Sequence, residues 1–276
     1  MQGIVLLYKG AIMEQKTRWE SLNQVKKVIV VMSGKGGVGK STVSVNIAAG
    51  LAKRGHKTGI LDADLHGPSV VKMLKLEGMR PDITADEKMV PVKYSETLSV
   101  LSVASLLDSE NDATIWRGPA KAGIIKQFIQ DTQWGALDYL IIDCPPGTGD
   151  EPLSVVQMAG KVDGAVIVTT PQEVSLIDVK KSITFANKLS VPVYGIVENM
   201  AGFTCPHCGK VSHIFSQGGG QDLALQSSVP LIAQIPLIMQ IGEGGDAGLP
   251  FMFNDSPMLS DARNALNVLL DYIEKR

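Results

Sequence analysis

The sequence predicts an α/β fold: a doubly wound, mostly parallel sheet with helices on both faces. Three observations lead to this prediction. Short apolar runs rich in β-branched residues recur along the chain, these runs are continuous and do not alternate with polar residues, and helix-length segments separate them. Strands that are buried on both faces have continuous apolar sequences, and strand–helix alternation is typical of a parallel sheet covered by helices.

The apolar runs give the expected strands in chain order, at 28–32, 58–63, 98–103, 139–143, 164–170, 193–199 and 231–236. The expected helices lie between and after them, at 41–55 (with Gly55 as a stop signal), 118–132, 150–160, 175–189 and 256–276. Residues 78–97 are polar and break the alternation, so we expect an excursion or hairpin there. The glycine-rich pieces 216–222 and 242–250 are expected to form mobile loops.

Length, charge and cysteine usage limit the class of protein. The 276 residues are 45% hydrophobic with a net charge of −2, so no basic excess indicates nucleic-acid binding. No apolar run approaches the roughly 18 residues of a membrane span, so no membrane partner is expected. Three cysteines are too few for a secreted disulfide framework and favour a reducing, cytoplasmic setting. We expect an N-terminal extension at 1–26 and one domain at 27–276.

The stretch SGKGGVGKST (33–42) lies between the first strand and the first helix, and it matches the phosphate-binding pattern G-x-x-x-x-G-K-[ST]. Its glycines let backbone N–H groups surround phosphate oxygens, the following helix presents its positive end, and Lys40 adds a charge on the outer phosphates. The Ser41 hydroxyl is a ligand for Mg²⁺. The predicted nucleotide-binding residues of the loop are Gly34, Lys35, Gly36, Gly37, Val38, Gly39, Lys40, Ser41 and Thr42.

Acidic residues follow two of the expected strands. Asp62 and Asp64 end the second strand, at the sheet edge where α/β proteins bind ligands. Asp143 follows four apolar residues, which is a Walker B pattern whose carboxylate reaches Mg²⁺ directly or through water. The segment PPGTGD (145–150) that comes after it is a candidate switch loop, and Cys144 is expected to be a small buried hydrophobe.

A thiol pair, Cys205 and Cys208, lies in CPHCG (205–209) within a predicted loop at 200–217. Four interpretations are open. The pair could form part of a zinc site completed by His207 and His213, a thioredoxin-like redox pair, or a pair without a role. The fourth is half of a [4Fe–4S] site, since such a cluster needs four thiolates and one chain offers two.

The phosphate loop carries a second lysine, Lys35, and in this it resembles the deviant Walker A loop of the MinD/ParA/NifH class of ATPases. The resemblance implies that Lys35 reaches across a dimer interface to the partner's nucleotide, as an arginine finger does. It also implies that Asp64 orients the attacking water and that Asn199, at the end of VYGIVEN, contacts adenine. The predicted catalytic residues are therefore Lys35, Lys40 and Asp64.

From about residue 26 to 273 the chain resembles the Mrp/ApbC family of iron–sulfur cluster carrier ATPases. The matching pieces are GKGGVGKST, DADLHGPS, WRGP (116–119), DCPPGTGD, ENMAGFTCPHCG and GEGGDAGLP. The resemblance implies a homodimer that binds ATP and Mg²⁺ and holds a labile [4Fe–4S] cluster on Cys205 and Cys208 of both chains. It further implies a cluster donor scaffold and apo-protein recipients as partners.

Two alternatives stay open from the sequence. A MinD/ParA-like positioning ATPase would need a membrane-binding or DNA-binding surface, but the apolar face of the final helix favours packing on the sheet. A zinc-stabilised nucleotide-binding regulator would hold Zn²⁺ on the thiol pair and carry no cluster. The chain also lacks the four-cysteine N-terminal motif of eukaryotic relatives and the accessory domain of others, which implies separate proteins for loading or target choice.

Overall fold

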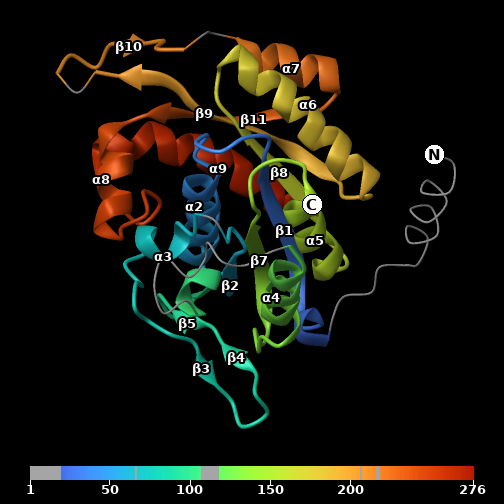
Figure 1. Ribbon diagram of the computed structural model, residues 1–276. Helices are drawn as coiled ribbons and strands as arrows, with labels where there is room; N and C mark the ends of the chain where they lie inside the picture. Colours follow the sequence, from blue (N-terminus) through green and yellow to red (C-terminus); the bar gives the residue numbers. More distant parts are fainter. Residues whose placement is uncertain (1–19, 66, 107–117, 206, 216–217) are drawn as a thin grey trace, which may run out of the picture.

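A computed structural model describes residues 20–65, 67–106, 118–205, 207–215 and 218–276 (Figure 1). Most of the expected N-terminal extension therefore lies outside the described residues, as do Trp116 and Arg117 of the WRGP motif. The described residues also include the short 3₁₀ turns η1 (Glu20–Leu22), η2 (Val103–Leu106) and η4 (Pro257–Leu259).

The main sheet has nine strands within the described part of the chain, and two of these are antiparallel edges. The seven parallel strands, in spatial order, are β6 (Leu98–Ser102), β2 (Thr58–Asp62), β7 (Leu137–Asp143), β1 (Val25–Ser33), β8 (Gly164–Thr169), β9 (Val193–Thr204) and β11 (Leu231–Leu237). The short antiparallel strands are β5 (Val92–Lys93) beside β6 and β10 (Val211–Ser212) beside β9. The predicted, mostly parallel sheet is confirmed.

The central strand β1 shows why the apolar runs are continuous. Val28, Val30 and Met32 point into one hydrophobic core, whereas Ile29 and Val31 point into the core on the opposite face. Side chains alternate between the two faces of a strand, so a strand covered on both faces needs apolar residues at every position.

Helices cover both faces of the sheet (Figure 1). On one face lie α2 (Lys40–Lys53), α3 (Val70–Met73), α8 (Met239–Ala247) and α9 (Ser260–Lys275). On the other face lie α4 (Gly118–Gln130), α5 (Asp150–Ala159), α6 (Glu173–Lys188) and α7 (Gly219–Ser227). The doubly wound architecture is therefore confirmed.

The polar segment 78–97 forms a hairpin, as expected. Its strands β3 (Asp82–Ile83) and β4 (Met89–Val90) pair in antiparallel fashion outside the main sheet. Figure 1 shows this hairpin projecting from the lower end of the molecule, below α3 and α4.

The expectation of a mobile loop at 242–250 is wrong, because α8 occupies residues up to Ala247. The glycines in this helix allow close packing: a Cβ on Gly244 would lie 2.7 Å from the Leu249 carbonyl oxygen. Gly248 then ends the helix with a left-handed φ of 76°. The second half of the other glycine-rich piece is also helical, since α7 begins at Gly219. Tertiary packing outweighs the low helix propensity of glycine at these positions.

The last helix, α9, is a core helix. Ala262, Leu266, Leu269, Leu270 and Ile273 have no exposed surface and pack against the sheet and α2. This burial confirms the expectation that the apolar face of α9 packs on the sheet. Among the described residues, no helix has the length and apolarity that crossing a membrane requires.

Two neighbouring residues of α9 give a matched test of this packing. Leu269 is fully buried, while Val268 is 55% exposed. We expect Leu269→Ala to lower the free energy of unfolding by about 2–5 kcal/mol, because the truncation leaves a cavity. Val268→Ala should change it by less than about 0.5 kcal/mol. Urea denaturation followed by circular dichroism measures both, and equal effects of the two variants would contradict the burial of this face.

Candidate functional site

The phosphate loop lies where the strand order reverses. From β1 the chain passes to β2 and β6 on one side of the sheet, and later to β8, β9 and β11 on the other side. The loop connects the C-terminal end of β1 to α2, and Gly37 and Gly39 adopt left-handed φ values of 78° and 82°. Ligands of open α/β sheets bind at such a reversal point.

A cavity of about 250 Å³ opens at this loop. Asp64 and Pro146, which follow neighbouring strands, line part of it. Most of the predicted loop residues line it as well: Lys35, Gly36, Gly37, Gly39, Lys40, Ser41 and Thr42. A Cβ on Gly36 or Gly37 would meet nothing within 4 Å, so the backbone there faces open space. The cavity suits a phosphate chain held by backbone N–H groups and one buried lysine.

Gly34 and Val38 support the loop from behind. A Cβ on Gly34 would lie 2.4 Å from Cβ of Asp178, so only glycine allows the loop to rest directly on α6. Val38 is 2% exposed and belongs to the hydrophobic core. Neither residue lines the cavity, so both support the loop on the side that faces the protein interior.

Asp143 holds the loop and the helix together. Its carboxylate is fully buried, forms an ion pair with Lys40 Nζ at 2.8 Å, and accepts hydrogen bonds from Ser41 Oγ and Ser44 Oγ, both at 2.6 Å. The two predicted Mg²⁺ ligands, Ser41 and Asp143, are therefore in direct contact. Ser44 was not predicted; its only signal is that it follows Ser41 by three residues and so shares the same helix face.

The site is rich in negative charge. Asp64 Oδ2 lies 3.8 Å from Lys40 Nζ, and Asp62 is fully buried nearby. Burial works against a charged Lys40, but Asp143, Asp64 and Asp62 outweigh it and raise the pKa of the ammonium. Burial and then repulsion by Asp143 raise the pKa of Asp62 to about 7. Asp143 and Asp64 alone place two carboxylates beside one ammonium, and this surplus of negative charge fits a hard divalent cation bound together with a nucleotide.

Asp62 links the predicted catalytic residue to its surroundings. Its carboxylate accepts hydrogen bonds from the backbone N–H groups of Asp64 and Val70 and from the hydroxyl of Ser102. Asp64 in turn accepts a hydrogen bond from the backbone N–H of Gly67. The turn between β2 and α3 is thus built around these two carboxylates, and it carries Asp64 into the cavity.

Lys35 lies at the rim of the cavity, where its Nζ donates a hydrogen bond to Oε1 of Gln172 at 2.9 Å. Gln172 follows β8 and directly precedes α6, so this hydrogen bond joins the phosphate loop to the start of α6. Sequence reasoning did not single out Gln172.

Asn199 is buried behind the loop. Its Nδ2 donates a hydrogen bond to the carbonyl oxygen of Val38 at 3.0 Å, and a Cβ on Gly39 would lie 2.1 Å from the same nitrogen. Asn199 lines neither the first cavity nor the one described next, so its contact with adenine stays a prediction. The side chain connects β9 to the phosphate loop.

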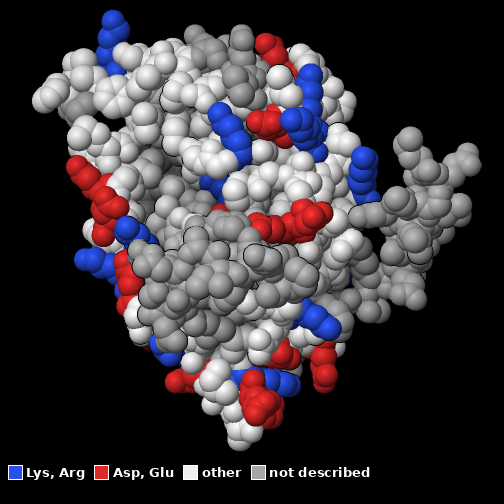
Figure 2. Space-filling model, viewed as in Figure 1, with Lys and Arg blue, Asp and Glu red and all other residues white. Residues whose placement is uncertain are grey.

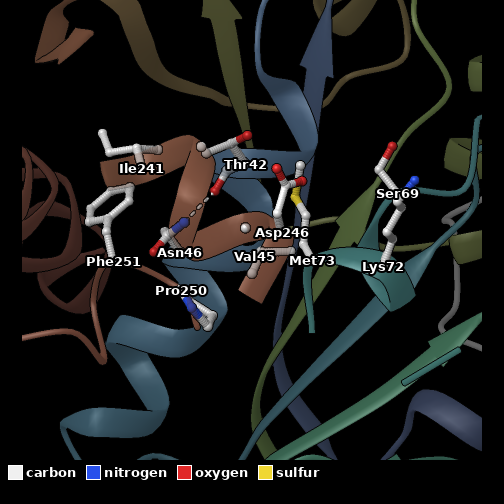
Figure 3. A pocket seen from close by; sticks show the side chains of 12 residues that line it. Thr42, Val45, Asn46, Ser69, Lys72, Met73, Ile241, Asp246, Pro250 and Phe251 are labelled. Atoms are coloured by element: carbon white, nitrogen blue, oxygen red, sulfur yellow. Dashed lines mark hydrogen bonds between the residues drawn. The ribbon is translucent and has the colours of Figure 1, made fainter. Parts of the chain in front are cut away.

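A second cavity of about 350 Å³ adjoins the first and shares Thr42, Ser69 and Met73 with it. Figure 3 shows its walls: Thr42 and Asn46 project from α2, Ile241 and Phe251 stand on one side, and Ser69 and Lys72 on the other. The glycine-rich α8 forms part of the lining. The GEGGDAGLP piece therefore lines a cavity next to the phosphate loop, a position that its sequence did not indicate.

The thiol pair lies at the tip of the hairpin formed by β9 and β10. The Cys205 N–H donates to the Lys210 carbonyl, the Gly209 N–H donates back to the Cys205 carbonyl, and Gly209 has a left-handed φ of 70°. Hydrogen bonds to the sulfur from the backbone N–H of His207, the backbone N–H of Cys208 and the Cys208 thiol lower the pKa of Cys205. N–H groups that point at sulfur favour the thiolate, the form that binds a metal.

The two thiols of the pair lie at the surface. Cys205 is partly exposed and Cys208 is exposed, and within the described residues no group of three or more histidine, cysteine or acidic side chains could hold a metal ion. Cys144 is fully buried, and burial raises the pKa of its thiol to about 12. Its expected role as a buried hydrophobe is therefore confirmed.

Comparison with known proteins agrees with this geometry. Residues 24–273 match the family model described as ParA, NUBPL iron-transfer P-loop NTPase. The chain belongs to this family. It is a P-loop NTPase with the predicted fold and phosphate loop.

Among relatives, the iron-sulfur cluster carrier protein of Methanocaldococcus jannaschii is 45% identical over 255 residues, which cover 92% of this chain and 88% of that protein. The cytosolic Fe-S cluster assembly factor Nubp2 homolog of Anopheles gambiae is 51% identical over 231 residues, covering 82% and 89%.

Two solved structures show the same fold. A nucleotide-binding protein from Archaeoglobus fulgidus in complex with ADP has a TM-score of 0.75 at 41% identity, covering 88% of this chain and 93% of that one. The cell division ATPase MinD of Pyrococcus furiosus has a TM-score of 0.68 at 25% identity, covering 91% and 99%.

The lowered pKa of Cys205 leads to a measurable reactivity in the metal-free NTPase. Only the thiolate reacts with iodoacetamide, so a lowered pKa gives Cys205 more reactive thiolate below the pH of about 8.5 at which a free cysteine is half ionised. We expect the midpoint of its alkylation rate against pH to lie below the midpoint of the same residue in unfolded protein, as quantified by mass spectrometry of the Cys205 peptide.

The control is the same protein unfolded in urea. There the hydrogen bonds to the Cys205 sulfur are lost, and the midpoint should return to its ordinary value. Cys144 should react only after unfolding, because it is buried. A Cys205 midpoint that is identical in folded and unfolded protein would show that the hairpin does not favour the thiolate.

Proposed function

We propose that the protein is an ATP-hydrolysing carrier of a labile [4Fe–4S] cluster, which a homodimer holds on Cys205 and Cys208 of both chains and passes to apo-proteins. The single observation that carries the proposal is the position of the thiol pair. It begins directly after the end of β9, and Asn199 of the same strand contacts the phosphate loop. The names of the relatives, cluster carrier and cluster assembly factor, support the same activity.

The dimer follows from the number of ligands. A [4Fe–4S] cluster takes four thiolates, and each hairpin offers two. Val211 and Ile214 are 52% and 57% exposed on the same hairpin, and they would become covered if two hairpins met. A cluster held by two ligands from each chain across an interface that can open is released more readily than one enclosed in a single chain. We further propose a separate donor scaffold that loads it.

On the nucleotide side, the chain's own residues supply binding and orientation. The loop N–H groups and Lys40 bind the phosphates, and Asp143 positions Lys40 and Ser41. Mg²⁺, when bound through Ser41 and Asp143, supplies charge neutralisation on the outer phosphates. Asp64 orients the attacking water, and Lys35 leaves Gln172 to stabilise charge on the partner's nucleotide.

Strand β9 provides a path by which the nucleotide state reaches the thiols. Asn199 contacts the loop at one point of this strand, and Cys205 follows its end. Between them Met200 has a left-handed φ of 58°, and the pairing with β11 shifts between Ile235 and Leu237. This irregular segment is where the hairpin can change direction relative to the sheet. In this proposal residues 27–276 are one ATPase domain, and its 200–217 segment carries the cluster.

Catalysis across the dimer can be tested by mixing two inactive variants. We expect Asp64→Asn and Lys35→Gln each to lower the ATP hydrolysis rate by about 10²-fold or more while ATP still binds, because each removes a group that acts in the transition state. In a mixed dimer, the site with wild-type Asp64 receives wild-type Lys35 from the other chain.

Equal amounts of the two variants should therefore recover about a quarter of the wild-type rate, since half of the dimers are mixed and each has one complete site. Phosphate release measures this recovery. The double variant Lys35→Gln/Asp64→Asn serves as a partner that cannot complement Lys35→Gln, because it has no Lys35 to supply. A mixture that stays as inactive as its components would show that Lys35 does not act on the partner's nucleotide.

The carrier function is tested by anaerobic reconstitution. We expect about four iron atoms and four sulfides per dimer in the wild type, and loss of both in Cys205→Ala and Cys208→Ala. Cys144→Ala is the matched control, since it removes the third, buried cysteine and should leave the cluster intact. Iron and sulfide analysis with absorbance near 400 nm measures the result.

Transfer is then followed from the loaded dimer to an apo-ferredoxin with and without ATP. Acquisition of the cluster by the ferredoxin supports the carrier function, and equal rates under both conditions would remove the coupling to ATP. A colourless protein with stoichiometric zinc after anaerobic purification would instead favour a zinc-stabilised regulator.

A further inference from the structure

A groove runs along α6, and none of its lining residues lines the cavity at the phosphate loop. Its first part has a volume of about 470 Å³, and a second part of about 350 Å³ continues from it through Lys180 and Thr184 toward the end of α7. Ile177 is 62% exposed in the groove, and Phe185 is partly buried at its floor. None of the residues in this groove has a part in the binding or catalysis described above.

Among the described residues, the charged side chains that line the groove are Lys180, Lys181 and Lys188, and Asp178 pairs with Lys181 beside it. The chain as a whole has a net charge of −2, whereas the charged side chains that line this groove are positive. In Figure 2 several blue side chains, with red ones among them, lie over the upper right part of the molecule, where Figure 1 draws α6. Lys180 Nζ donates a hydrogen bond to Oε1 of Gln226 at 2.7 Å, and Lys181 Nζ forms an ion pair with Oδ1 of Asp178 at 3.2 Å.

The groove also touches the segment that follows the Walker B aspartate. Thr148 lines its end, and the neighbouring Gly147 donates its backbone N–H to the Ser33 carbonyl at 2.8 Å, at the start of the phosphate loop. On the other side, Gly34 of the loop rests directly on α6 at Asp178. The walls of the groove are therefore in contact with elements that must respond to the γ-phosphate.

The surface fits one kind of partner best. Lysines around an exposed isoleucine and a half-buried phenylalanine match an acidic protein surface that carries an apolar residue, because the charges guide the encounter and the apolar contact adds affinity. A nucleic acid or an anionic membrane also attracts lysines, but the net negative charge of the whole chain repels an extended polyanion.

We propose that the α6 groove is the site where acidic recipient proteins dock on the loaded dimer. In this proposal the segment at Thr148, which lines the end of the groove, makes docking depend on the bound nucleotide. This inference rests on the proposed carrier function and names the surface and the charge of its recipients. It assigns a role to Lys181 and Lys188 that requires neither nucleotide nor cluster contact.

The test uses the loaded dimer, a fluorescently labelled acidic apo-ferredoxin as the probe, and the variant Lys181→Glu/Lys188→Glu. We expect its dissociation constant for the probe at low salt to rise about tenfold or more, with a matching fall in the cluster transfer rate at sub-saturating probe. Wild-type binding should weaken as salt is added, whereas binding by the variant should depend little on salt. Cluster content and ATP hydrolysis without the probe should match the wild type.

The matched control is Lys93→Glu/Lys126→Glu, which changes the net charge by the same amount at two exposed lysines outside the groove. It should bind and transfer as the wild type does. An equal loss in both variants would reduce the effect to overall charge and overturn the docking inference. A smaller loss with Lys181→Gln/Lys188→Gln than with the reversed charges would support it.

Other outcomes separate the two proposals. If the wild type transfers its cluster but Lys181→Glu/Lys188→Glu binds and transfers equally well, the docking inference fails and the carrier function stands. If the loaded wild type never transfers, the carrier function itself fails. Two further results would overturn the inference by assigning the groove to another occupant. The first is loss of the dimer in the variant, measured by light scattering. The second is unchanged probe binding combined with lost binding to anionic vesicles or single-stranded DNA.

Discussion

The buried carboxylate of Asp143 is the constraint on which the nucleotide site depends. It lies at the end of β7, yet it fixes three side chains of α2: the ammonium of Lys40 and the hydroxyls of Ser41 and Ser44. A buried carboxylate is stable only when its charge and lone pairs are matched, so the sheet and the first turn of α2 are held in one arrangement. The geometry of the phosphate loop, which connects that sheet to that helix, follows from this contact.

The same sheet carries the thiol pair, and the two sites differ in rigidity for a physical reason. The loop rests on α6 at Gly34 and on Asn199 at Gly39, with no room for a side chain at either glycine. Beyond Met200 the pairing of β9 with β11 resumes only after a register shift, at Phe203 and Leu237, and only two residue pairs join β9 to β10. Few buried contacts make an element easier to displace. The rigid site therefore binds the nucleotide, and the displaceable element holds the thiols.

Much of this arrangement could be predicted from the sequence, because continuous apolar runs and the phosphate-loop pattern are local signals. The full length of β9 could not, since its extension to Thr204 contains Met200 and Gly202 and pairs through a register shift. The helical state of α8 was missed because its glycines are selected by close packing, which the sequence does not display. The contact between Lys35 and Gln172 joins residues 137 positions apart, and no local pattern indicates such a pair.

In the proposed function, the exposure of Cys205 and Cys208 distinguishes a carrier from a protein that permanently keeps its metal centre. Cys144 shows that this fold can bury a cysteine completely, with the thiol kept protonated by its surroundings. Cys205 and Cys208 instead lie at the surface, in a hairpin whose backbone favours the thiolate. A site intended for permanent ligation gains from burial, because solvent and competing thiols are excluded. A site that must release its cluster to another protein's thiolates needs them accessible, and the structure keeps them so.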